Sequence, residues 1–259
     1  MLSSIFKPKF TKNLIRIGQK LDGGYVINQE ILKKTKILLT FGLSDEFSFE
    51  KDFKKRNKNI NIFAYDHTVN IFFWTQHFIK WFFHFIKNQS NFRRIFYFID
   101  YFFFFSQNNV KHIKKKIVPN GFEDNQSTSL TKIFNEKNFD KSQVLLKVDI
   151  EKDEYKILNE ICNLDILCLI IEFSDFDKNI DIIKNFILKT NLKIIHLHAN
   201  NFGYVNSKGY PEHLEITFGN PKYIEIDEKK IDFTKYPVHG LDYPNDTKKK
   251  DISISFKDF

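Results

Sequence analysis

Three side chains that can exchange protons follow three separate apolar runs of the chain. Asp149 lies near the end of the run 143–150, Glu172 near the end of 166–173, and His198 just after 192–197. If these runs are neighbouring parallel strands, their carboxyl ends meet at one edge of a sheet, where such folds bind ligands. Two carboxylates and an imidazole gathered there could take a proton from a substrate hydroxyl or hold a divalent metal ion. His196 is expected to be structural and to face away from His198.

A further apolar run predicts a cofactor site. In the segment 37–53, ILLTFGLSDEFSFEKDF, the run breaks at Gly42, and small and acidic residues lead into a helix-like pattern. A buried strand that turns at a glycine into a helix is how open α/β sheets build nucleotide sites. The next run, 60–65, is followed by Asp66, at the place where such folds hold the hydroxyls of a ribose. Gly42 and Asp66 are therefore expected to bind a cofactor.

The chemistry of the turn after Gly42 narrows the choice of cofactor. Asp45 and Glu46 follow Ser44 directly, and carboxylates repel a phosphate but accept hydrogen bonds from an ammonium group. The chain contains no GxGxxG, GxxxxGK[ST] or GxSxG motif, which disfavours a dehydrogenase, a P-loop nucleotidase and an α/β-hydrolase. S-adenosylmethionine, which carries an amino-acid end and no phosphate, is the favoured cofactor. An NAD-linked enzyme is the less favoured alternative.

A glycine pair near the N-terminus marks a second loop of interest. The segment 22–27 reads DGGYVI, so Gly23 and Gly24 precede a short alternating apolar stretch. This pattern is typical of a tight turn into a strand. The turn could be a simple hairpin, or its backbone could lie over the cofactor.

The elements that must position these residues alternate along the chain. Strands are expected at 37–41, 60–65, 116–119, 143–150, 166–173, 192–197, 213–218 and 252–256, with helices after 47 and at 129–134, 151–161 and 180–189. This order predicts an α/β protein with a doubly wound, mostly parallel sheet. The segment 221–250 is polar, contains prolines and is expected to be irregular. We expect one domain over residues 1–259.

An aromatic segment interrupts this order after Asp66. Residues 71–110 include FFWTQHFIKWFFHFIK and RRIFYFIDYFFFF, which predicts a helical insertion of two amphipathic helices joined near 88–91. The insertion could form a core or an oligomer contact, cover the acceptor as a lid, or associate with a membrane surface. Its residues Trp74, Trp81 and Tyr97 could stack on a sugar.

Composition limits the partners and the compartment. The 259 residues carry a net charge of +8, but the basic residues are spread along the chain, which favours a solvated surface over nucleic-acid binding, with an anionic substrate as the alternative. No apolar run approaches the length of a membrane helix, and the N-terminus lacks the apolar core of a secretory signal. Cys162 and Cys168, the two cysteines, are expected to be buried free thiols. We expect a cytoplasmic protein with no nucleic-acid partner and no transmembrane segment.

Several motifs resemble the FkbM-type family of S-adenosylmethionine-dependent methyltransferases. The segment 145–155, LLKVDIEKDEY, is similar to the family's K-I-D-I-E-G-x-E motif, with Lys152 in place of its glycine. The segments TFGLSDEFSFE, AYDHT, IIEF, HLHANN, LEITF and DGGYVI resemble the family's cofactor turn and later strands. The resemblance covers roughly residues 15–70 and 117–256 and implies the Rossmann-like, seven-stranded class I methyltransferase fold.

The resemblance also assigns residues. It implies that Gly42 and Ser44 line the methionine end of the cofactor and that Asp66 accepts hydrogen bonds from the ribose. The backbone of Asp22, Gly23, Gly24 and Tyr25 would cover the methionine carboxylate, Glu123 or Asp124 would lie near the adenine, and Asp149 would lie where the methyl group meets the acceptor.

The resemblance implies an O-methyltransferase, and members of the family often act on sugar hydroxyls. A hydroxyl needs a base, for which Asp149, Glu172 and His198 are the candidates. Asn200 and Asn201 could contact acceptor hydroxyls or form a turn. A divalent metal held by Asp149, Glu172 and His198 is possible but not favoured. The expected acceptor is a small molecule, a free or nucleotide-linked sugar of a bacterial capsule or surface polysaccharide. The alternative is a non-catalytic binding or assembly module, which docks or forms a homo-oligomer through the aromatic insertion.

Overall fold

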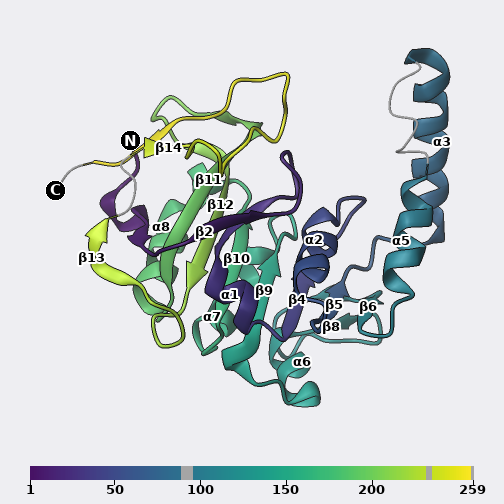
Figure 1. Cartoon of the computed structure of the whole chain (residues 1–259), viewed down its shortest axis with the longest axis horizontal. Coiled ribbons are helices and arrows are strands. Elements are labelled where there is room, and N and C mark those ends of the chain that lie inside the picture. The colour runs from purple at the N-terminus through teal and green to yellow at the C-terminus, as the bar shows by residue number, and fades with distance from the viewer. Residues whose placement is uncertain (89–95, 232–234, 258–259) are drawn as a thin grey trace.

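A central sheet of seven strands organises the chain (Figure 1). The computed structural model describes residues 1–88, 96–231 and 235–257. In sheet order the strands are β11 (Lys193–Val205), β12 (Pro211–Gly219), β10 (Cys168–Phe173), β9 (Val144–Val148), β4 (Ile37–Phe41), β5 (Asn61–Tyr65) and β6 (Val110–Ile113). Only β12 runs antiparallel to its neighbours in this sheet, and the pairs from β10 to β6 are parallel. The predicted fold class is confirmed.

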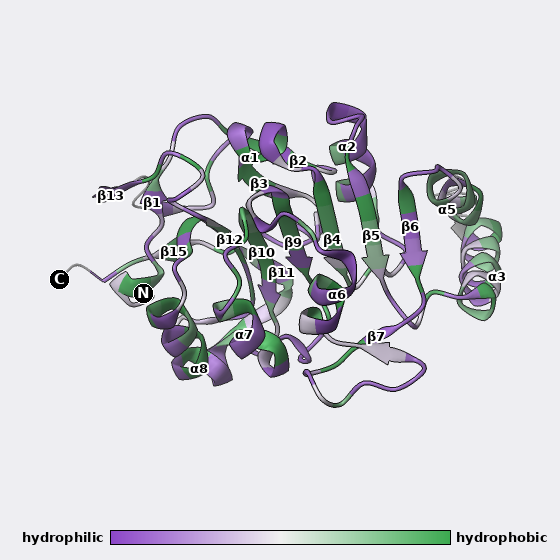
Figure 2. Cartoon of the chain, turned by 90° about the horizontal axis from the view of Figure 1, so that it is seen from below, coloured by the Kyte–Doolittle hydropathy of each residue, from purple (hydrophilic) through white to green (hydrophobic). Residues whose placement is uncertain are grey.

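Helices cover both faces of the sheet (Figure 2). One face carries α1 (Gln29–Lys34), α2 (Ser48–Arg56) and the hairpin of β2 (Leu14–Ile17) with β3 (Tyr25–Asn28), and the other carries α6 (Leu130–Lys137), α7 (Glu154–Cys162) and α8 (Phe176–Lys189). Successive strand residues point to opposite faces, so Leu38 packs in one core and Leu39 in the other. All five residues of β9 are buried, as expected for a strand covered on both sides.

The aromatic segment forms the crossover between β5 and β6. It contains α3 (Ile71–Asn88) and α5 (Tyr97–Phe105), which lie beyond β6 at one end of the molecule (Figures 1 and 2). The buried side chains of Trp74, Tyr101 and Phe104 join the core under α2, while much of α3 projects away from the sheet. The predicted joint near 88–91 falls largely outside the described residues.

The third parallel strand lies earlier than predicted. We expected it at 116–119, but the strand that pairs with β5 is β6, and the predicted insertion 71–110 took in its first residue, Val110. The segment 116–119 contributes only β7 (Lys116–Ile117), which pairs with β8 (Ser127–Thr128) outside the main sheet. The sequence VKHI carries two polar residues in four positions, so it lacked the apolar run by which the other strands were found.

The C-terminal segment is more regular than predicted. Within 221–250, β13 (Asp227–Ile231) pairs with β1 (Lys9–Phe10), and β14 (Lys235–Tyr236) pairs with β15 (Ile254–Ser255). Two short 3-10 turns, η1 (Ser4–Phe6) and η2 (Lys141–Gln143), complete the elements of the described residues. None of the helices among the described residues has both the length and the apolar character needed to span a membrane.

Candidate functional site

A cavity of about 780 Å³ opens where the parallel strands end. It brings together most of the residues singled out in the sequence, namely Asp22, Gly23, Tyr25, Gly42, Ser44, Asp66, Asp149, Glu172 and Asn200. The loop before β3 supplies Asp22 and Gly23, and β3 begins at Tyr25. The next five residues lie at or just after the ends of β4, β5, β9 and β10. The carboxyl ends of parallel strands meet at one edge, so residues far apart in sequence share this cavity.

The Gly42 turn fits against the end of β9. Gly42 has φ +82°, and a Cβ atom there would lie 1.7 Å from the carbonyl oxygen of Asp149. Only glycine adopts this conformation readily, and any side chain would collide with the neighbouring backbone. The glycine therefore allows the two strand ends to close on each other beneath the cavity.

Asp66 holds the Gly42 turn in shape. Its Oδ2 accepts hydrogen bonds from the N–H groups of Leu43 and Ser44, at 2.8 and 3.2 Å. Its Oδ1 accepts from the N–H and the hydroxyl of Thr68, at 2.7 and 2.6 Å. Burial alone would raise the pKa of Asp66, but these hydrogen bonds outweigh it and lower the pKa below its usual value.

The same contacts leave few free backbone N–H groups to which a phosphate could bind. A phosphate site on a glycine turn uses free backbone N–H groups and the helix N-terminus. Here Asp66 takes the amides of Leu43 and Ser44. At the start of α2, the N–H of Ser48 donates to Oε1 of Glu46 at 2.8 Å. The turn is therefore a poor cradle for a diphosphate.

The loop with Gly23 and Gly24 is both a hairpin turn and a wall of the cavity. It joins β2 to β3, which pair antiparallel, and its residues Asp22 and Gly23 line the cavity, whereas Gly24 does not. A Cβ atom on Gly24 would lie 2.1 Å from the carbonyl oxygen of Gln19. The hydroxyl of Ser48 donates to the carbonyl of Gly23 at 3.2 Å, which fastens the loop to the start of α2.

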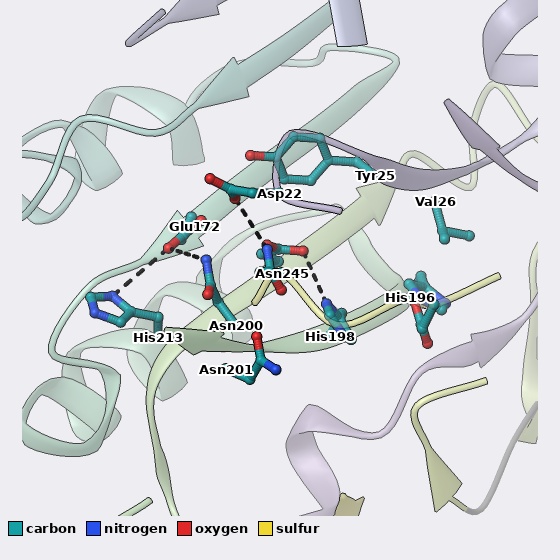
Figure 3. A network of polar contacts seen from close by, with 12 residues as sticks. Asp22, Tyr25, Val26, Glu172, His196, His198, Asn200, Asn201, His213 and Asn245 are labelled. Atoms are coloured by element: carbon teal, nitrogen blue, oxygen red, sulfur yellow. Dashed lines mark hydrogen bonds and ion pairs between the residues drawn. The ribbon is translucent and has the colours of Figure 1, made fainter. Parts of the chain in front are cut away.

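Glu172 contacts Asn200 and His213 in the cavity (Figure 3). Its side chain is 11% exposed, and the Nδ2 of Asn200 donates to its Oε1 at 3.3 Å. Burial, followed by the negative charges of Asp149 and Glu215, raises its pKa well above the usual value.

His213 was not singled out as a site residue from the sequence. Its Nδ1 lies 3.8 Å from Oε1 of Glu172, and its Nε2 lies 3.8 Å from Oε2 of Glu212. It lines the cavity and is about a quarter exposed. The signal that could have found it is strand pairing, because His213 stands opposite Asn200 in the β11–β12 register.

Lys147 is a second residue that the sequence reasoning missed. It is buried, and its Nζ lies 3.9 Å from both Oε1 of Glu50 and Oδ2 of Asp149. Burial alone would lower its pKa, but Glu50 and Asp149 outweigh it, so the pKa is raised. The hydroxyl of Tyr25 also donates to Oδ2 of Asp149, at 3.4 Å. A permanent cation and a phenol thus hold the Asp149 carboxylate.

The structure does not support His198 as the base. His198 is buried outside the cavity, with Nδ1 3.4 Å from Glu215 and Nε2 3.2 Å from Asp251. Burial alone would lower its pKa, but these two carboxylates raise it to about 10. An imidazolium has no lone pair with which to accept a proton. The expectation that His196 is structural agrees with its burial and its 2.8 Å contact with Asp242. The orientation expected for it was wrong, because side chains two positions apart in a strand face the same side.

Other predicted residues lie outside the cavity. Glu123 and Asp124 lie in a surface loop before β8 and do not line it. Asn201 is buried and binds the backbone of Asp246 through both side-chain atoms, at 2.9 and 2.7 Å. His198 does not line the cavity with Asp149 and Glu172, and no cluster of three or more His, Cys, Asp or Glu suited to a metal occurs among the described residues.

The aromatic helices do not cover the cavity. None of the described residues of α3 and α5 lines it, so the lid interpretation is wrong for this part of the chain. Trp74 is buried against Tyr101, with ring centroids 4.9 Å apart, and is not available to a sugar in the cavity.

The backbone conformation at Lys152 is one that suits glycine, the residue that the similar K-I-D-I-E-G-x-E motif has at this position. Glu151 and Lys152 both have positive φ, +42° and +77°, a conformation that non-glycine residues rarely adopt. The Nζ of Lys152 forms an ion pair with Asp175 at 2.6 Å. Strained backbone of this kind often lies beside functional sites, and these two residues line the cavity.

Comparisons with known proteins give distant structural likenesses. No protein-family model matches the chain, and no curated protein matches it. Among solved structures it is similar to precorrin-6y C5,15-methyltransferase from Geobacter metallireducens (10% identity, 74% of this chain and 88% of that one, TM-score 0.39). It is also similar to M. jannaschii TYW2 in complex with AdoMet (10% identity, 82% and 89%, TM-score 0.36) and the Methanococcus jannaschii fibrillarin pre-rRNA processing protein (10% identity, 73% and 67%, TM-score 0.40). Likenesses at this level do not identify a function, which must rest on the site itself.

Proposed function

We propose that the chain is an S-adenosylmethionine-dependent O-methyltransferase that acts on a sugar hydroxyl. One observation carries the proposal: a single cavity joins a glycine turn that is closed to phosphate with an imidazole held between two carboxylates. The first part suits a cofactor without phosphates. The second suits the removal of a proton from a hydroxyl.

The charge of the cavity favours a cationic cofactor. Its lining carboxylates (Asp22, Asp45, Glu46, Asp66, Asp149, Glu151, Asp153, Glu172 and Glu212) outnumber its lysines (Lys115, Lys116, Lys147 and Lys152). S-adenosylmethionine carries a sulfonium and an ammonium group against one carboxylate. When bound, it supplies a methyl group activated for displacement by a nucleophile.

Named residues would hold each part of the cofactor. Gly42 and Ser44 would line its methionine end, together with the loop of Asp22 and Gly23. Asp66 would meet the ribose, where a ribose hydroxyl can replace the Thr68 hydroxyl without breaking any backbone contact of the carboxylate. Ile117 and Ile150, apolar residues of the lining, would flank the adenine.

His213 is the proposed base in place of His198. It takes the proton of the acceptor hydroxyl, and Glu172 and Glu212 then stabilise the imidazolium between them. Asn200 fixes the Glu172 carboxyl through its hydrogen bond. Asp149, held by Lys147 and Tyr25, lies at the boundary between the cofactor and the acceptor.

The acceptor end of the cavity suits a sugar. Asn200 and Glu212 offer hydrogen bonds to hydroxyls, and the ring of Phe202, 53% exposed, offers a flat apolar surface for a sugar face. Lys115 and Lys116 at the lining could meet the phosphates of a nucleotide-linked sugar. We therefore propose a sugar of a bacterial capsule or surface polysaccharide, free or nucleotide-linked, as the substrate.

A transfer assay tests the proposal. Purified protein with S-adenosylmethionine labelled in the methyl group is incubated with a panel of free and nucleotide-linked sugars, and methylated products are identified by mass spectrometry. We expect label in at least one sugar as a methyl ether, and much less with Phe202→Ala. Transfer only to amines or thiols, or to no sugar in a panel covering the common surface sugars, contradicts the proposed acceptor.

A further inference from the structure

The helices α3 and α5 present a large apolar surface to solvent. On α3, the exposed side chains Ile71, Phe72, Phe78, Ile79, Phe82, Phe83 and Ile86 fall on one stripe, because the helix repeats every 3.6 residues. On α5, Phe102 and Phe103 are also exposed. Contiguous apolar surface of this extent marks an interaction site on a soluble protein.

The opposite face of the helix pair is fixed to the body. Trp74 packs on Tyr101 of α5, and the Nε2 of His77 lies 2.9 Å from Oδ2 of Asp45 in the cofactor turn. Phe104 of α5 stacks on Phe47, with ring centroids 5.8 Å apart. The inner face therefore serves the core. Phe78 at one edge of the stripe also packs on Phe98 of α5, with ring centroids 6.0 Å apart, while Phe72, Phe83 and Ile86 remain largely exposed.

The charges beside the stripe have one sign. Residues 71–88 include no Asp or Glu, and the exposed Lys80 and Lys87 lie at one edge of the stripe. The one acid of α5, Asp100, forms an ion pair with Lys51 of α2 at 3.0 Å. A depression of about 930 Å³ beside α5 is lined by four lysines and four acids, namely Lys51, Lys54, Lys55, Lys58, Asp45, Glu46, Asp52 and Asp100, so it adds no net charge to the helix pair.

We propose that this helix pair docks the protein on the surface of an anionic lipid bilayer. An apolar stripe rich in Phe and edged by lysines is the pattern of a helix that lies in the membrane interface. The aromatic and aliphatic side chains enter the boundary of headgroups and acyl chains, and the lysines meet anionic headgroups.

A second copy of the chain fits this surface less well. In a symmetric contact the same patch meets itself, so Lys80 and Lys87 would face another lysine-bearing helix that carries no acid. An anionic bilayer supplies both the apolar layer and the opposite charge. The proposal is independent of methyl transfer, because none of the described residues of the pair lines the cofactor cavity.

Vesicle binding tests the proposal on the full chain. Both tryptophans of the protein, Trp74 and Trp81, lie in α3, so tryptophan fluorescence, excited where tyrosine does not absorb, reports on this helix alone. We expect co-sedimentation with vesicles of phosphatidylcholine and phosphatidylglycerol, a blue shift of the emission, and quenching by brominated lipid. Vesicles of phosphatidylcholine alone should bind more weakly, and high salt should reduce binding to the anionic vesicles.

Matched variants separate docking from general stickiness. Phe83→Glu removes a 65% exposed ring from the stripe and should weaken binding about tenfold or more. Phe122→Glu changes a 77% exposed ring in the loop at Gly121 and should bind as the wild type does. Lys80→Gln with Lys87→Gln should weaken binding to anionic vesicles about 25-fold, at roughly fivefold for each lysine.

Three results would overturn the proposal. The first is no binding to anionic vesicles by the wild type. The second is equal binding by Phe83→Glu and the wild type. The third is a dimer in solution that Phe83→Glu dissociates while vesicles fail to bind, which would assign the stripe to a second copy instead.

Discussion

The carbonyl oxygen of Asp149 lies 1.7 Å from the position that a Cβ atom on Gly42 would occupy. Gly42 follows β4 and Asp149 follows β9, and the N–H of Asp149 donates to the carbonyl of Phe41 at 2.8 Å. The turn proposed for the cofactor and the acid proposed to stand beside the acceptor are therefore one packed unit. A substitution at either residue should therefore disturb both the cofactor end and the acceptor end of the cavity.

Gly42→Ala should destabilise the fold and abolish cofactor binding. The positive φ and the overlap with Asp149 together should lower the free energy of unfolding by roughly 2–4 kcal/mol. Gly121→Ala is the matched control, because Gly121 has φ +88° and no atom within 4 Å of its Cβ position, so only about 1 kcal/mol is expected. Denaturant unfolding measures both. Equal losses in the two variants would show that the contact with Asp149 does not matter.

Asp66→Asn should loosen the Gly42 turn. Both oxygens of Asp66 accept hydrogen bonds from backbone N–H groups, so either orientation of the asparagine amide places its NH2 group against one of these donors. The free energy of unfolding should fall by about 1–3 kcal/mol, and binding of S-adenosylmethionine should weaken. Thr68→Val removes only a hydroxyl that a ribose could replace, so its affinity should stay within a few-fold of wild type. Calorimetric titration compares the two. If Asp66→Asn binds as wild type does, Asp66 has no part in the cofactor site.

His213→Gln should lower kcat without affecting cofactor binding. Loss of a general base is expected to reduce the rate about 10²- to 10⁴-fold, with an unchanged Kd for S-adenosylmethionine. His198→Gln should instead lower the free energy of unfolding by about 3 kcal/mol, since it leaves Glu215 and Asp251 without their cation. Activity per folded molecule should then be retained. The reverse pattern would restore His198 as the base.

Glu154 should make stability depend on pH. Burial raises its pKa from 4.5 to about 7, its Oε1 accepts from the N–H of Ser174 at 2.8 Å, and its Oε2 is buried with no hydrogen-bond partner. The unfolded chain releases this proton first as pH rises. The stability contributed by the neutral carboxyl is therefore complete below pH 4.5, and about 3 kcal/mol of it is lost by pH 7.

Glu154→Gln isolates this effect, because glutamine imitates the neutral acid. The variant should match the wild type near pH 4.5 and exceed it in stability above pH 7, as measured by unfolding in denaturant across that range. Glu123→Gln, on the surface, should keep the wild-type slope. An unchanged slope in Glu154→Gln would mean that Glu154 is already ionised in the fold.

The sequence predicted the sheet because its strands are apolar runs with turn signals between them. The runs before Asp149 and Glu172 form the neighbouring strands β9 and β10, and β4 lies between β9 and the strand that ends before Asp66. The strand VKHI was missed because an edge strand needs few apolar residues, and Val110 is its one buried residue.

Site residues that lie directly at a strand end were predicted from the sequence. Those whose position depends on contacts between distant segments were missed. His213 reaches the cavity because β12 inserts antiparallel between β10 and β11, which no local pattern reveals. His198 leaves the site because the C-terminal segment supplies Asp251, 53 residues further along the chain. Lys147 was missed because it lies inside the apolar run of β9. Its partner Glu50 lies on helix α2, far from it in the sequence.

Calorimetric titration with S-adenosylmethionine, run beside NAD, tests the central claim most directly. We predict saturable one-site binding of S-adenosylmethionine by the wild type, none by Gly42→Ala under conditions where that variant is folded, and no heat with NAD. The reason is that the amides needed by a diphosphate already donate to Asp66. No binding of S-adenosylmethionine by the wild type, or binding of NAD as tight as that of S-adenosylmethionine, would contradict the account.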